Sequence, residues 1–189
     1  MTHKKINFKG RHAAAGLSMI ELALVLPVLM LLLMGVTDFG RFNLFDNILI
    51  NLSREGANLA ARTSLSPQFI IDALNHTASP LDMEAHGMVY ITRVVGVDGG
   101  AGTVVSRVEE QYRASVGDTS LHSKLSWTCS SWTGAKCNLP AATADRLVVL
   151  PLPLALGAEV HVVETLYHYS AFTKFLFSTD PDLYSSTLL

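Results

Sequence analysis

The chain has 189 residues, 49% hydrophobic and 16% charged, with a formal net charge of −2 at pH 7. This length suits one domain and an additional segment. Residues 1–16 hold four of the 14 basic residues and none of the 16 acidic ones, so the rest of the chain has ten basic and 16 acidic residues, a net charge of −6. Since no basic patch remains to neutralise phosphates, we expect no nucleic-acid partner.

Residues 17–36 form an apolar run in which Glu21 is the only ionisable side chain. A helix of this length, at about 1.5 Å per residue, matches the roughly 30 Å hydrocarbon core of a bilayer, so the run is predicted to be a transmembrane helix. A charge inside a bilayer costs on the order of 2.5 kcal/mol or more when it is unpaired. Glu21 therefore needs either a shallow position near the headgroups or a partner.

Basic residues flank only the N-terminal side of this run: Lys4, Lys5, Lys9 and Arg11. Asp38 follows the run directly. The positive-inside rule then places the N-terminus in the cytoplasm and the region after residue 36 on the other side of the membrane. A cleaved secretory signal is disfavoured, because no A-x-A-like site follows the run and helix-compatible sequence continues through its end.

The start of the apolar run reads GLSMIE at residues 16–21. The chain thus has a basic leader, then Gly16, and then Glu21 at the fifth position after that glycine. This arrangement resembles the type III signal of type IV prepilins. The resemblance implies that a prepilin peptidase cuts between Gly16 and Leu17 on the cytoplasmic side, after which the apolar helix stays in the membrane. A glycine suits such a site because it adopts the extended or left-handed backbone of a substrate in a protease cleft.

Cleavage at this bond would supply a partner for Glu21. The new α-amino group of Leu17 is a cation, and Glu21 lies four residues, about 6 Å, further along the helix axis. In a staggered assembly the amine of one subunit meets the carboxylate of the next, which satisfies two groups that are costly alone. The alternative is an ordinary signal anchor in which Gly16 and Glu21 occur by chance.

Further blocks narrow the family: IELALVLP at 20–27, Gly35, DFGR at 38–41, and SREGA at 53–57 followed by Ala60-Ala61. Together with residues 16–21 they are similar to the TadE-like pseudopilins of tight-adherence (Flp) pilus systems. Many prepilins have Phe where this chain has Leu17, and short Flp pilins have Glu-Tyr where it has Glu21-Leu22. The second difference and the large C-terminal region favour a specialised subunit over a bulk filament subunit.

The helical pattern continues to Arg62. Apolar and small residues recur every three or four positions and form a seam that faces a sheet or a partner helix: Phe39, Phe42, Phe45, Leu49, Leu52, Gly56 and Leu59. Pro27 is expected to kink or loosen the helix. Ser66-Pro67 predicts the cap and first turn of a second helix that ends near Thr77 and is followed by a linker over 78–87. The predicted inward residues of that helix are Phe69, Ile70, Ala73 and Leu74.

A β-hairpin is predicted over 88–112, with a glycine-rich turn at 98–102. Strict alternation in its second strand predicts Val104, Val108 and Tyr112 inward and Gln111 outward. Residues 146–156 contain two prolines, which predict an edge or crossing segment. The last predicted strand is 158–170. The resemblance to TadE-like proteins implies that this aromatic-rich strand completes the sheet and that Tyr167 and Tyr169 are its packing residues. The tail 171–189 is expected to be a short helix, a docking segment or partly disordered.

The two cysteines, Cys129 and Cys137, lie in a stretch that contains Gly and Ser. This stretch is predicted to lie across the membrane from the cytoplasm, where the environment is oxidising, so a local disulfide is favoured. A zinc site would need two further ligands, and no histidine has metal-like spacing with either cysteine. No cofactor or metal site is predicted. No nucleophile, base and orienting group can be assembled from the motifs, so we do not expect an enzyme.

The predicted architecture is α+β and pilin-like: a long N-terminal helix, partly transmembrane, packed on a small antiparallel sheet. The predicted segments are a cytoplasmic leader over 1–16, a transmembrane segment over 17–36, a periplasmic helix extension over 37–63 and a periplasmic domain with a disulfide loop over 64–189. The resemblance implies a minor pilin or pseudopilin of a Tad pilus in the bacterial inner membrane, either incorporated into the filament or retained in the membrane complex. Its implied partners are the prepilin peptidase, other pilins through the N-terminal helix, and the inner-membrane Tad platform. The alternatives are a single-pass anchored periplasmic binding domain and a type II secretion pseudopilin.

Overall fold

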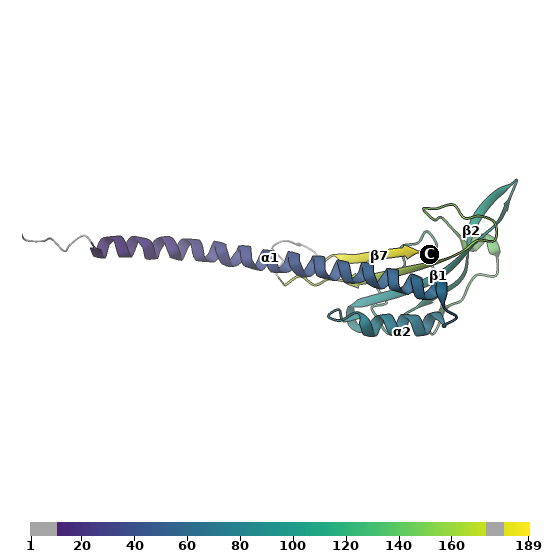
Figure 1. The fold of residues 1–189 in the computed structure, drawn as a ribbon, viewed down its shortest axis with the longest axis horizontal. Helices are drawn as coiled ribbons and strands as arrows, with labels where there is room; N and C mark the ends of the chain where they lie inside the picture. The colour runs from purple at the N-terminus through teal and green to yellow at the C-terminus, as the bar shows by residue number, and fades with distance from the viewer. Residues whose placement is uncertain (1–10, 173–179) are drawn as a thin grey trace, which may run out of the picture. The chain divides into compact units, whose positions relative to one another are not determined.

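The computed structural model of the chain describes the backbone of residues 11–172 and 180–189, and side chains from residue 19 onward (Figure 1). Residues 1–10 of the predicted leader and residues 173–179 of the tail lie outside the described residues. The chain divides into two compact units. We call residues 1–41 with 171–178 the N-terminal unit, and residues 42–170 with 179–189 the sheet unit.

A single helix, α1, covers Arg11–Arg62 and remains helical through Pro27. The sequence predicted the start of this helix at Leu17. The earlier start has a local reason, because residues 13–15 are all alanine, the residue with the strongest helix propensity. Residues 19–41 of α1 belong to the N-terminal unit, and residues 42–62 belong to the sheet unit.

The sheet unit contains one seven-stranded sheet in the order β3-β4-β2-β1-β6-β7, with β5 paired to β2 outside this path. The strands are β1 (Gly87–Gly100), β2 (Thr103–Arg113), β3 (Trp132–Thr133), β4 (Lys136–Cys137), β5 (Leu147–Val148), β6 (Glu159–His168) and β7 (Asp182–Leu188). All neighbouring strands pair antiparallel. The predicted α+β class, with a long helix and a small antiparallel sheet, is confirmed.

Residues 42–62 of α1 cover one face of this sheet with the seam that the sequence predicted. Leu49 and Leu52 are buried, and the Phe45 ring meets the Tyr167 and Tyr169 rings edge to face at centroid distances of 5.6 Å each. The seam does not extend to Phe39, which is 60% exposed. The burial of both tyrosines confirms their predicted packing role.

Helix α2 (Pro67–Thr77) lies beside the C-terminal end of α1 (Figure 1). Its N-cap is Ser66, whose side chain accepts a hydrogen bond from the Phe69 amide, as the sequence predicted. The predicted inward face is partly wrong, because Phe69 is 59% exposed and Ile71 is buried instead, together with Ile70 and Leu74. The predicted linker over 78–87 contains one helical turn, α3 (Met83–His86), which Asp82 caps.

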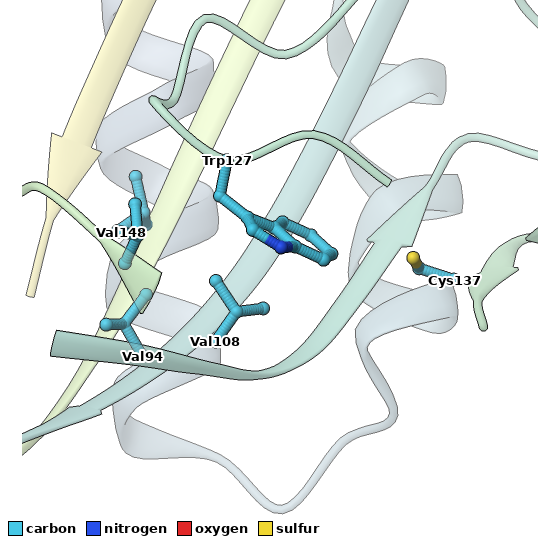
Figure 2. Close-up of a cluster of buried hydrophobic side chains, with 6 residues drawn as sticks. Val94, Val108, Trp127, Cys137 and Val148 are labelled. Atoms are coloured by element: carbon cyan, nitrogen blue, oxygen red, sulfur yellow. The ribbon is translucent and has the colours of Figure 1, made fainter. Parts of the chain in front are cut away.

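The opposite face of the sheet is covered by the region around the disulfide. A cluster of buried side chains fills this layer, and Figure 2 shows the Trp127 ring over Val108, between Val148 and Cys137. In β6, Val162 belongs to this cluster, whereas its neighbour Val163 lies on the α1 side, where a Cβ on Gly56 would be 3.0 Å from its Cγ1. Because adjacent residues of a strand point to opposite faces, the central strands bury both faces of the sheet.

A β-bulge explains why strict alternation failed in β2. Arg93 pairs with Glu110 but the next residue, Val94, pairs with Val108, so Glu109 is an extra residue in the ladder. The bulge places Val108 and Gln111, three positions apart, on one face, where they are 0% and 1% exposed. The prediction that Gln111 points outward was therefore wrong.

The tail forms the edge strand β7, which pairs with β6 along its whole length. The sequence predicted no strand there, because the inward positions of β7 include small polar residues. Ser185 is buried, and the Ser53 hydroxyl of α1 lies 3.0 Å from the Ser185 hydroxyl and 3.0 Å from that of Thr187. These hydrogen bonds satisfy buried hydroxyls that a hydrophobic pattern does not reveal.

Candidate functional site

The apolar part of α1 presents its side chains outward in every direction. The exposed large side chains in this segment are Met19, Ile20, Leu22, Leu24, Val25, Leu26, Val28, Leu29, Met30, Leu31, Leu32, Leu33, Met34 and Val36. By length and composition the described helix from Met19 to Arg62 could span a membrane, since its most apolar window has a mean hydropathy of 2.5 and none of it is buried. A helix that is hydrophobic all round needs an apolar environment.

Glu21 is exposed within this apolar segment and makes no ion pair with any residue that the structure describes. Leu17 lies four residues before it in the same helix, so the two positions share a helix face. In an apolar medium an isolated carboxylate is costly, and Glu21 has no neighbour in the described chain that offsets the cost.

The Gly16–Leu17 bond lies within α1, and the backbone is helical on both sides of it. The N–H groups of the first helical turn have no acceptor within the helix, so the start of a helix unravels more easily than its middle. The described part of α1 begins at Arg11, so an extended backbone at this bond requires the helix to open between Arg11 and Leu17.

Asp38 has a structural role that the sequence did not predict. Its side chain is buried, and its Oδ1 accepts a hydrogen bond of 2.9 Å from the backbone N–H of Phe172, inside the N-terminal unit. The aspartate of the DFGR block therefore ties the first residues of the tail to α1. The sequence placed this residue after the apolar run and within that block, and neither feature predicts its contact with Phe172.

Cys129 and Cys137 are bonded to each other across eight residues, with Cα atoms 6.0 Å apart. Their loop contains the short hairpin of β3 and β4, and β4 pairs with β2 through Lys136 and Tyr112. Cys137 is 3% exposed and belongs to the Trp127 cluster. The structure therefore contains the predicted pair, which anchors the loop to the sheet.

Glu164 attaches residues 123–124 to the same face of the sheet, a role that could not be predicted from the sequence. It is fully buried in the middle of β6, where it accepts hydrogen bonds from Ser123 Oγ, from the Lys124 backbone N–H at 2.8 Å and from the Tyr184 hydroxyl at 3.1 Å. Burial raises the pKa of Tyr184 to about 12, so its hydroxyl remains protonated and donates. Three donors stabilise this buried carboxylate and fix residues 123–124 on the sheet.

Within residues 11–172 and 180–189, no group of three His, Cys, Asp or Glu side chains is arranged to hold a metal ion. His161 and His168 lie at opposite ends of β6, next to Glu159 and Asp182 respectively. The strongest candidate for function therefore remains the apolar segment of α1 over residues 17–36, in which Glu21 is the single carboxylate.

These observations define a class of protein: an α+β domain that continues from a long N-terminal helix whose first half is apolar enough to span a membrane. Residues 16–58 match the family model described as TadE-like protein. Over these residues the chain is therefore similar to TadE-like proteins, which confirms the family resemblance and supports a component associated with the Tad pilus. The match starts at Gly16 and includes Glu21, the DFGR block and SREGA. No curated protein and no solved structure matches the chain.

Proposed function

We propose that this chain is a minor pilin or pseudopilin of a Tad (Flp) pilus, cut by a prepilin peptidase between Gly16 and Leu17. The observation that carries the proposal is Glu21: an exposed carboxylate on an apolar helix, without an ion-pair partner in the described chain, four residues after the first residue of the processed form. The new amine of Leu17 in one subunit pairs with Glu21 in the next. This pairing needs no further residue from the sheet unit.

In this proposal the protein is a structural component and not an enzyme. It lies in the bacterial inner membrane with its N-terminus in the cytoplasm and residues 37–189 in the periplasm, and it enters the filament or stays in the membrane complex. Its partners are the prepilin peptidase, the N-terminal helices of other pilins and the inner-membrane Tad platform. Support comes from the family match over 16–58 and from the basic residues before the apolar run.

The first test is the mass of the N-terminus after expression with and without the cognate prepilin peptidase. We expect the peptidase to produce a chain that begins at Leu17 and Gly16→Leu to block the cut, because a Cβ and a branched side chain restrict the backbone at the scissile bond. Gly10→Leu changes the other leader glycine and is the matched control, which should be cut normally. A chain that keeps Met1 beside an active peptidase would overturn the proposal and favour a simple anchor.

The second test separates cleavage from pairing. Glu21→Gln keeps the size of the side chain and removes its charge, so we expect normal cleavage but at least a tenfold loss of assembled protein in pulled-down pilus or platform fractions, an estimate based on the cost of an unpaired membrane charge. Glu55→Gln is the control, since Glu55 is also exposed on α1 and lies within the matched region. Normal assembly of Glu21→Gln would contradict the pairing role.

A further inference from the structure

A cavity of about 450 Å³ lies between the sheet and the disulfide loop, entirely inside the sheet unit. Its floor is formed by Tyr90 of β1 with Gln111 and Arg113 of β2, and its walls by residues 122–123, 128–130 and Trp132. The volume is typical of a small-molecule site and larger than an inorganic anion requires. Among the described residues that line it there is no aspartate or glutamate.

Arg113 gives this cavity a positive charge that no ion pair among the described residues neutralises. Its guanidinium lies over the Trp132 ring, 4.6 Å from the centroid, and it makes no ion pair with any residue in the described ranges. Two other arginines of the same hairpin differ, since Arg93 contacts Glu110 and Glu159, and Arg107 contacts Glu109. Arg113 is therefore available to a ligand carboxylate, which a guanidinium can bind through two hydrogen bonds.

Gln111 adds an unsatisfied polar group beside Arg113. It is 1% exposed, and its Nε2 donates to Thr92 Oγ1 at 3.0 Å, while its Oε1 is buried without a hydrogen-bond partner among the residues described. Buried amide oxygens normally have a partner, so a ligand hydroxyl at this floor would complete the amide. Tyr90 does not cancel the charge of Arg113, because burial raises its pKa to about 12 and its neutral hydroxyl donates to the Leu121 carbonyl at 2.7 Å.

The walls of the cavity are held in place by two independent attachments. Glu164 fixes residues 123–124 through the hydrogen bonds from Ser123 Oγ and the Lys124 N–H. The disulfide fixes Cys129, a wall residue, to Cys137 in the buried Trp127 cluster. A site with fixed walls loses little conformational entropy when a ligand binds.

We propose that this cavity binds a sugar acid, a hexose-sized ring that bears a carboxylate. The carboxylate pairs with Arg113, and the ring hydroxyls meet the Gln111 amide and the Thr128 and Ser130 hydroxyls on the wall. Trp132, against which the buried Tyr90 ring packs at a centroid distance of 6.0 Å, supplies apolar surface for the C–H groups of the sugar ring. This ligand uses the charge, the polar lining and the volume together, whereas a small inorganic anion uses only the charge. The inference does not depend on the proposed pilus role.

The test measures binding of glucuronate to the full chain by ligand-detected NMR and isothermal titration calorimetry. The chain is kept in an uncharged polyoxyethylene detergent, because a sugar or charged headgroup would compete for the site. We expect saturable binding of glucuronate, with glucose and acetate each at least about tenfold weaker, since each lacks one part of the recognised chemistry. Equal binding of acetate or of a dipeptide would show a simple carboxylate site, equal binding of glucose would show that Arg113 is not used, and no binding at all would also overturn the proposal.

Arg113→Gln tests the charge directly and should raise the dissociation constant for glucuronate at least about tenfold. Arg107→Gln is the matched control on the same strand, outside the cavity, and should leave binding unchanged. Thermal unfolding of each variant checks the fold, and Arg113→Lys, which keeps the charge, should retain measurable binding if Arg113→Gln is unstable. Unchanged affinity in Arg113→Gln, or equal losses in both glutamine variants, would overturn the assignment.

Discussion

The two halves of α1 have the same backbone but different surroundings. Over residues 19–36 nearly every apolar side chain is exposed, and Leu29 is 52% exposed. Over residues 42–62 a single seam is buried, and Leu49 is 0% exposed while the other side of the helix carries polar residues. The first half therefore needs apolar partners from outside the chain, whereas the second half has its partners in the sheet unit.

The same difference applies to the polar residues of the helix. The buried hydroxyl of Ser53, in the second half, forms hydrogen bonds with the hydroxyls of Ser185 and Thr187, so its partners lie within the chain. Glu21, in the first half, makes no ion pair with any of the described residues. The hydrophobic pattern distinguishes the two halves of α1 in the sequence. A helix that is buried on one side has an apolar seam, whereas a helix in lipid is apolar all round.

The largest expected effect is on stability and comes from truncating one leucine in each half. Leu49→Ala should lower the free energy of unfolding of the sheet unit by about 2–5 kcal/mol, because it leaves a cavity in a packed core. Leu29→Ala removes the same atoms from an exposed position and should change it by less than about 0.5 kcal/mol. Denaturant unfolding in detergent, followed by tryptophan fluorescence, measures both. Similar losses in the two variants would show that the halves are not packed differently.

A glycine pair from the same helix gives a smaller effect of the same kind. A Cβ on Gly56 would lie 2.7 Å from Leu74 Cδ1 and 3.0 Å from Val163 Cγ1, whereas a Cβ on Gly40 would meet none of the described residues within 4 Å. Gly56→Val should therefore destabilise the sheet unit by about 1–3 kcal/mol through overpacking. Gly40→Val should be neutral or slightly stabilising, since valine has the better helix propensity. Thermal unfolding by circular dichroism measures both, and a stable Gly56→Val protein would mean that the α1 seam adjusts freely.

Much of the fold could be predicted because its signals are local. The apolar run, the seam through Phe45 and Leu49, the Ser66 cap and the 88–112 hairpin each depend on residues close in sequence. The failures depend on tertiary contacts. The extra residue at Glu109 inverts the alternation of β2, and the inward serine of β7 resembles a solvent-facing position until its partner Ser53 is known.

The candidate sites also differ in whether their residues are close in sequence or are brought together by tertiary contacts. Glu21 could be proposed from the sequence because a carboxylate within an apolar run is conspicuous, and Gly16 because it belongs to the same local motif; both roles remain predictions. Glu164 and the cavity were not, because their groups come from separate segments: Tyr90 from β1, Arg113 from β2 and residues 122–130 from the loop. A charged residue in an alternating strand suggests an exposed position, and only the donors that surround Glu164 explain its burial.

The smallest expected effect is on the pH dependence of stability and concerns His161, on the sheet face that α1 and α2 partly cover. Burial lowers the pKa of His161 below its ordinary value of 6.5; Glu159 and Glu110 oppose this shift, and Arg93 adds to it. The unfolded chain therefore binds more protons at this residue than the folded chain does. The contribution of His161 to stability is fully present above about pH 6.5 and is lost as the pH falls towards the folded pKa.

His161→Gln removes this contribution, so the stability of the variant should fall less steeply than that of the unmodified chain between about pH 7 and pH 5. His76→Gln, which changes an exposed histidine near the end of α2, is the control and should keep the original slope. Denaturant midpoints of the three proteins across this range measure the slopes. Parallel curves for His161→Gln and the unmodified chain would mean that water reaches His161 freely, and so that the helices cover this end of the sheet less completely than they cover the Leu49 seam.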